Sequence, residues 1–148
     1  MGRFDVTVLG FTVGNPELQF LVSEDWDSGS ASFSAIQAGF RAGGSFTGTS
    51  APSGMTIAIG VPHRFEFYVD LSSGTQDTWG CRITRLDTTN VLHSIRGLNT
   101  RAPNCRPNRV VWNASVNPGA INPDPFARVT NIHIEARNKV RPTLFFMK

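Results

Sequence analysis

The stretch FEFYVDL, residues 65–71, is the clearest guide to the fold of this chain. Its odd-numbered residues are apolar, and its even-numbered residues are charged or carry a polar hydroxyl. Strict alternation with period two is typical of a β-strand that buries one face and exposes the other. The stretch therefore predicts a strand whose phenylalanines point into a core.

The same pattern recurs along the chain. Alternating segments or short apolar runs occupy residues 4–8, 18–22, 33–36, 55–61, 81–86, 110–116, 130–136 and 144–147. Segments rich in Gly, Pro, Asn and Ser separate them, and three prolines interrupt residues 117–125. Short strands with frequent turns predict an all-β fold: one antiparallel β-sandwich domain over 1–148, with about ten strands. Only residues 86–98 leave room for a short helix.

Composition excludes several protein classes. The chain has 148 residues, of which 40% are hydrophobic and 17% are charged. This balance excludes an intrinsically disordered chain and a coiled coil. No apolar run is long enough to span a membrane as a helix, so no integral membrane segment is expected. The first residues lack the apolar core of a signal peptide, which predicts a cytoplasmic or non-classically secreted protein.

The charge pattern is biased towards arginine. Net charge is +3, and only Lys139 and Lys148 are lysines. No basic tail is present, so an arginine-rich surface is the favoured interpretation and no nucleic-acid partner is expected. The two cysteines, Cys81 and Cys105, are interpreted as reduced structural thiols, with a single disulfide as the alternative.

The sequence offers no recognisable catalytic or metal-binding motif. His133 lies on the polar side of an alternating segment, and His93 is interpreted as structural. His63 follows Pro62 where a strand meets a loop, which makes it a candidate binding residue. The acids around Trp26 are interpreted as a solvated turn rather than a calcium site. We therefore expect a protein that is not an enzyme and holds no metal or cofactor.

Three segments resemble one known family. GGSFTGTS at 43–50, MTIAIGV at 55–61 and YVDL at 68–71 look like motifs of the fungal fruit-body lectins, whose β-sandwich is actinoporin-like. The resemblance implies a first sugar site that uses Ser45, Thr49 or Ser50 with His63. It implies a second site that uses Asp70, Leu71 and Ser73. Arg96 or Arg101 is the candidate for the arginine that follows the family's Tyr-rich segment, and Arg96 is taken as a candidate binding residue.

The leading hypothesis is therefore a lectin that binds galactose, N-acetylgalactosamine or N-acetylglucosamine through its loops, with carbohydrate or glycoconjugate partners. We expect a homo-oligomer. One alternative is a structural or assembly protein, such as a viral or phage capsid, spike or decoration jelly roll, because low charge and many phenylalanines suit buried interfaces. Another is a membrane-acting cytolysin with the same fold.

Overall fold

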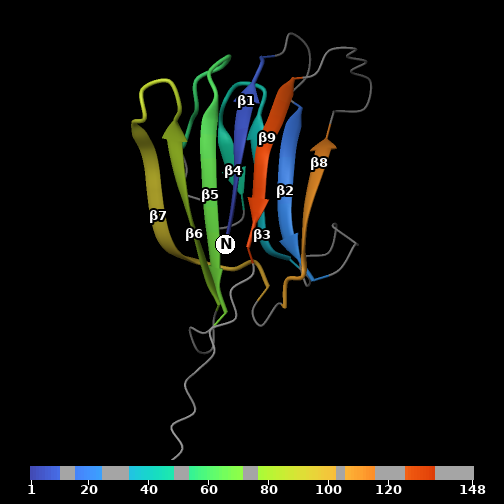
Figure 1. Cartoon of the computed structure of the whole chain (residues 1–148). Helices are drawn as coiled ribbons and strands as arrows, with labels where there is room; N and C mark the ends of the chain where they lie inside the picture. The colour runs from blue at the N-terminus through green and yellow to red at the C-terminus, as the bar shows by residue number, and fades with distance from the viewer. Residues whose placement is uncertain are drawn as a thin grey trace, which may run out of the picture.

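The chain forms a sandwich of two antiparallel β-sheets in a computed structural model (Figure 1). The structure describes residues 1–10, 16–24, 34–48, 54–71, 77–102, 106–115 and 126–135. The described strands are β1 (Gly2–Val8), β2 (Glu17–Ser23), β3 (Ser34–Arg41), β4 (Phe46–Gly48), β5 (His63–Asp70), β6 (Thr78–Arg85), β7 (Val91–Asn99), β8 (Arg109–Ser115) and β9 (Ala127–Ile134). This confirms the predicted all-β sandwich.

Five strands form one sheet and four form the other. The five-stranded sheet has the order β7-β6-β5-β1-β9, and the four-stranded sheet has the order β4-β3-β2-β8. The stretch FEFYVDL at residues 65–71 lies mostly within β5, in the middle of the larger sheet. Its neighbours are β1 and β6 on either side, so its inward face meets the other sheet across the core.

The core between the sheets is built from phenylalanine rings. Phe65 of β5 is fully buried, and its ring centroid lies 4.9 Å from that of Phe20 and 5.7 Å from that of Phe40 in the opposite sheet. Both of those pairs meet edge to face, which is a favoured geometry for aromatic rings. The alternation read from residues 65–71 therefore places the side chains as expected: Phe65 and Phe67 are buried, and the residues between them face outward.

One sequence-based expectation about secondary structure is wrong, and one strand was not expected. Residues 86–98, the segment with room for a short helix, form a turn at 86–88 that leads into the unexpected strand β7. Residues 55–61 do not form a regular strand: Thr56 makes a single bridge to Ser45, although Met55 and Ile57 are buried as expected. That segment packs its apolar residues against the edge of the sandwich instead of joining a sheet. The expected strand at 144–147 lies outside the described residues.

The two sides of the sandwich differ. On one side, residues 54–60 link the edge strands: Phe46 donates its backbone N–H to Met55 near β4, and His93 of β7 lies 3.4 Å from the Thr56 carbonyl. On the other side, where β8 and β9 are the edges, a cavity of about 290 Å³ opens between the sheets. Its walls are mainly apolar and include Val22, Phe67, Val69, Val110 and Ile134.

Candidate functional site

The residues predicted to bind sugar lie at two ends of the sandwich. His63 begins β5 and Asp70 ends it, so about 23 Å of extended strand separates them. Ser45 lies at the His63 end, where it bridges Thr56. Leu71 lies at the Asp70 end, with its side chain exposed. A single groove shared by Ser45, His63 and Asp70 is therefore not formed. Three of the predicted residues, Thr49, Ser50 and Ser73, lie outside the described residues.

His63 is a core residue in this structure. Its side chain is fully buried, and its Nδ1–H donates to the Val61 carbonyl at 2.8 Å. Its Nε2 is buried without a hydrogen-bond partner. Burial lowers the pKa of His63 below its usual value, against the opposing effect of the Val61 bond, and holds the ring neutral. A ligand in solution does not reach this ring, so His63 is not a binding residue of the free surface.

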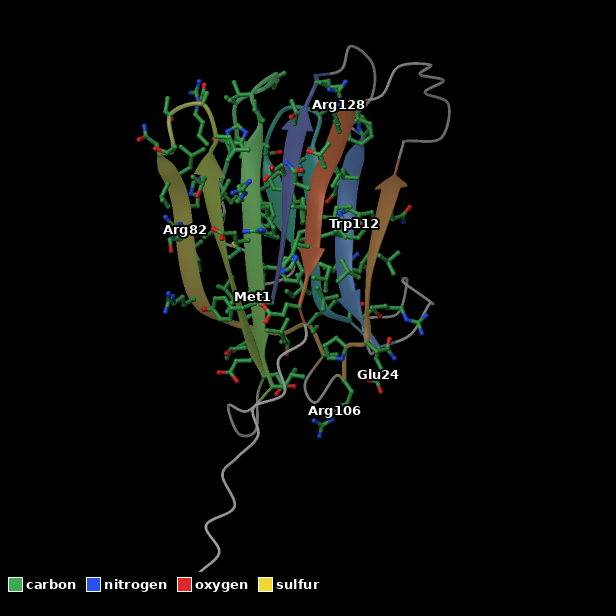
Figure 2. All side chains as sticks on the ribbon, in the orientation of Figure 1. Met1, Glu24, Arg82, Arg106, Trp112 and Arg128 are labelled. Atoms are coloured by element: carbon green, nitrogen blue, oxygen red, sulfur yellow. The ribbon has the colours of Figure 1, made fainter. Side chains whose placement is uncertain are left out.

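Asp70 and Arg96 both lie on the outer face of the five-stranded sheet. Since Phe4, Phe65, Phe67, Cys81 and Ile83 point into the core, the residues between them point away from it. This outer face carries five arginines and three acids: Arg3, Asp5, Arg64, Glu66, Asp70, Arg82, Arg96 and Arg128. Figure 2 labels Arg82 and Arg128 on it. Part of the excess of arginine in the sequence therefore lies on this face.

Tyr68, the one tyrosine of the chain, lies across the middle of this face. It pairs with Gly80 on β6. A Cβ atom on residue 80 would collide with the phenolic oxygen and would come within 2.5 Å of Cζ, so the phenol end of the Tyr68 side chain lies over the glycine. The absence of a side chain at 80 thus lets this end of the ring lie against the backbone of β6. Tyr68 is only partly buried, so part of its side chain remains exposed on the outer face.

A bulge in β7 places Arg96 beside this ring. Trp79 pairs with Leu98 and Cys81 pairs with Ile95, so Gly80 faces two residues of β7, Arg96 and Gly97. Gly97 has φ of +72°, the left-handed conformation that glycine adopts readily. Such bulges bend a strand and redirect a side chain, and they are frequent beside functional sites. Here the extra residue is an arginine on the outer face.

Charged residues cross the face in register. Arg3, Glu66 and Arg82 are direct cross-strand neighbours on β1, β5 and β6, and Ser94 of β7 follows. Within the described residues, neither Arg82 nor Arg96 forms an ion pair or a side-chain hydrogen bond. Both guanidinium groups point away from the core and have no protein partner in that part of the chain.

One arginine of the face has a structural role instead. The side chain of Arg64 donates to both carboxylate oxygens of Asp5, at 2.9 and 3.2 Å, and the Asn131 amide donates to the same carboxylate at 2.6 Å. Burial raises the pKa of Asp5, but the hydrogen bonds from Arg64 and Asn131 outweigh it and lower the pKa below its usual value. This network ties β1, β5 and β9 together, so Arg64 is not available to a ligand.

The outer face is hollowed around Tyr68. A depression of about 200 Å³ is lined by Met1, Glu66, Tyr68, Arg82, Ser94 and Arg96, with parts of Phe67, Cys81 and Ile95 at its floor. This volume is smaller than a drug-sized pocket and suits a contact with one small ring or chain unit. An aromatic ring, a carboxylate, a hydroxyl and two guanidinium groups converge there.

Two of the predicted binding residues, Asp70 and Arg96, lie on this face. Glu66, Tyr68, Gly80 and Arg82 also belong to it and were not predicted. The alternation at 65–71 and 81–86 already placed Glu66, Tyr68 and Arg82 on the solvent side. The pairing of Tyr68 with Gly80 depends on strand register, which no local pattern in the sequence specifies. No local pattern in the sequence predicts the bulge that places Arg96 either.

The described residues contain no cluster of three or more His, Cys, Asp or Glu side chains that would hold a metal ion. They also contain no helix of the length and hydrophobicity needed to cross a membrane. Cys81 is a buried free thiol, and burial raises its pKa to about 11. Its possible partner Cys105 lies outside the described residues.

Comparison with known proteins gives no relative for this chain: no family model, no curated protein and no solved structure matches it.

Proposed function

We propose that this protein is a non-enzymatic glycan-binding protein, and that the outer face of its five-stranded sheet holds the sugar. The observation that carries the proposal is the Tyr68 ring, whose phenol end lies over Gly80 and which lines a hollow edged by hydrogen-bonding groups. A sugar ring has an apolar side that packs on an aromatic face and hydroxyls that need polar partners around the edge. The hollow supplies both.

The polar groups around Tyr68 match the needs of hydroxyls. Glu66 is an acceptor, Arg82 and Arg96 are donors, and the Ser94 hydroxyl is both. The phenolic oxygen of Tyr68 makes no hydrogen bond to any described residue, so it is free to donate or accept. The side chains that frame the hollow stand on paired strands of one sheet, which fixes their spacing better than a loop would.

The family resemblance points to the same function and to a partly different set of residues. Two residues of the second site implied by the fungal fruit-body lectin motifs, Asp70 and Arg96, are on the proposed face. Asp70 lies two residues beyond Tyr68 on the same side of β5. An actinoporin-like identity for the sandwich remains part of this proposal.

A glycan array that includes terminal galactose, N-acetylgalactosamine and N-acetylglucosamine tests the function. We expect binding by the wild-type protein and at least a tenfold loss of affinity in Tyr68→Ala, which corresponds to about 1.4 kcal/mol. Tyr68→Phe retains the ring and should retain most of the binding.

Leu92→Ala is the matched control, because it removes an exposed apolar side chain of β7 away from the hollow. Unfolding midpoints of all variants show whether the fold is intact. Absence of binding to every glycan at millimolar concentration, or full binding by a folded Tyr68→Ala variant, contradicts the proposal.

A second candidate function, assembly with further copies, is favoured by the β9 edge. Among the described strands, β9 has a neighbour on one side only, and it exposes Ile132 and Ile134 at 51% and 47%. An unpaired, apolar edge strand is a template for pairing with another chain.

Size-exclusion chromatography with light scattering tests this candidate. A defined oligomer that Ile132→Lys converts to a monomer would support it. A monomeric wild-type protein at high concentration would exclude it.

A further inference from the structure

We propose that the saccharide bound on the outer face is acidic, with its carboxylate or sulfate group held between Arg82 and Arg96. This inference rests on the proposed function and specifies its ligand class. Both arginines line the hollow around Tyr68, and neither forms an ion pair or a side-chain hydrogen bond in the part of the chain that the structure describes.

The contrast with Arg64 supports this assignment. Arg64 stands on the same face and is held by Asp5 in a two-bond contact, which in turn is anchored by Asn131. The sheet thus already contains one arginine–carboxylate pair that stabilises the fold. Arg82 and Arg96 offer the same planar pair of donors and form no ion pair with any described carboxylate, so a ligand carboxylate or sulfate would complete the geometry.

The charge balance of the hollow also favours an anion. Its lining includes Arg82 and Arg96 with Glu66, and Arg3 is the next neighbour of Glu66 on β1. Arg3, Arg82 and Arg96 together outweigh Glu66 and Asp70, the two acids of β5 on this face, which leaves a net positive charge beside the aromatic ring. Every basic side chain that the structure places on this face, apart from His133 on β9, is arginine. Arginine recognises planar or tetrahedral anions bidentately, whereas lysine acts as a point charge.

The same observations argue for a saccharide rather than a nucleic acid. Nucleic-acid binding requires several phosphates to be neutralised along an uninterrupted basic track. Here Glu66 and Asp70 interrupt the arginines on β5, where they would repel a phosphate chain. Among the described residues of this face, Tyr68 is the one aromatic platform, which suits a single ring unit better than a stacked row of bases. Glu66 instead provides an acceptor for sugar hydroxyls.

Isothermal titration calorimetry with matched sugars tests the inference. The probes are galactose oligomers against galacturonate oligomers, and N-acetylglucosamine against its 6-sulfate, each measured at low and at moderate salt. We expect the acidic member of at least one pair to bind tenfold or more tightly than the neutral member, with an advantage that shrinks as salt rises.

Three arginine variants separate the contributions. Arg82→Ala and Arg96→Ala should each reduce acidic-sugar affinity at least tenfold and leave neutral-sugar affinity within about threefold. Arg106→Ala is the matched control, because it removes an exposed arginine just ahead of β8, away from the hollow (Figure 2). Unfolding midpoints confirm that all three variants are folded.

The outcomes separate a failure of the acidic-sugar assignment from a failure of the glycan-binding proposal. Equal or tighter binding of the neutral sugars overturns the acidic assignment and leaves the glycan-binding proposal standing. No binding of any sugar overturns both. Tighter binding of a single-stranded RNA homopolymer than of any acidic sugar, with the same loss in Arg82→Ala, overturns the inference in favour of a nucleic-acid ligand.

Discussion

The network around Asp5 gives a sharp test of the fold that supports the proposed site. Asp5 is 5% exposed, and it accepts two hydrogen bonds from Arg64 and one from Asn131. Asp5→Asn keeps the shape of the side chain and removes its charge. The new amide group would meet the donors of Arg64 or Asn131, so at least one of the three hydrogen bonds is lost.

The burial of the Asp5–Arg64 pair determines how much stability Asp5→Asn is expected to lose. Breaking a fully buried ion pair costs about 3–5 kcal/mol. The Arg64 side chain is 36% exposed and is partly solvated once its partner is neutral. We therefore expect Asp5→Asn to reduce the free energy of unfolding by about 2–3 kcal/mol at pH 7. For a chain of this size the loss corresponds to about 4–12 °C in Tm.

The pH dependence adds a second readout. The hydrogen bonds from Arg64 and Asn131 hold the pKa of Asp5 below the value of 3.8 that applies in the unfolded chain. The stabilisation is therefore complete above that value and is lost as pH falls through the lower, folded-state pKa. The wild-type protein and Asp5→Asn should converge in stability at strongly acidic pH.

Urea unfolding followed by tryptophan fluorescence, at pH 7 and at strongly acidic pH, measures both effects. Asp87→Asn is the control, because the Arg85–Asp87 pair is exposed and should leave the midpoint close to wild type. A midpoint for Asp5→Asn equal to wild type at pH 7 would refute the reasoning. An undiminished difference at acidic pH would also refute the assignment of the effect to the Asp5 charge.

Three further predictions follow from single residues. Gly80→Ala should unfold at a lower denaturant concentration and lose glycan binding. Its Cβ would lie within 2.5 Å of the Ile95 carbonyl oxygen and would displace Tyr68. Wild-type glycan binding by this variant would contradict the placement of Tyr68 over Gly80. Burial lowers the pKa of His63, so the wild-type protein should lose stability as pH falls below about 6.5. The loss should be smaller in His63→Phe. Parallel pH profiles of the two proteins in urea unfolding would contradict this. In a Cys105→Ser background, Cys81 should react with iodoacetamide far more slowly in the folded than in the urea-unfolded protein, because burial raises its pKa to about 11; equal rates would contradict its burial.

The alternation of residues was enough to predict the fold class and the strands with one buried face. Residues 65–71 are the best example, because local side-chain direction is all that the pattern needs. Residues 86–98 show the limit. In β7 the register with β6 shifts twice, and these shifts break the period of two, so the segment does not read as a strand. Pairing with β6 decided its structure.

The candidate site could be predicted only in part for the same reason. The polar residues of alternating strands were visible, and so was the excess of arginine. Which of them meet depends on the antiparallel register of β1, β5 and β6 and on the bulge at Arg96 and Gly97. His63 shows the opposite error: its place at a strand end suggested a binding residue, whereas the fold buries it.

The central claim is that the outer face of the five-stranded sheet, and not the end of the sandwich that holds Ser45, binds the sugar. The most direct measurement is a two-dimensional NMR titration of isotope-labelled protein with the tightest-binding glycan. The account predicts that amide shifts concentrate at residues 66–68, 80–82 and 94–97. Shifts concentrated at residues 43–48 and 60–63, with none around Tyr68, would contradict it.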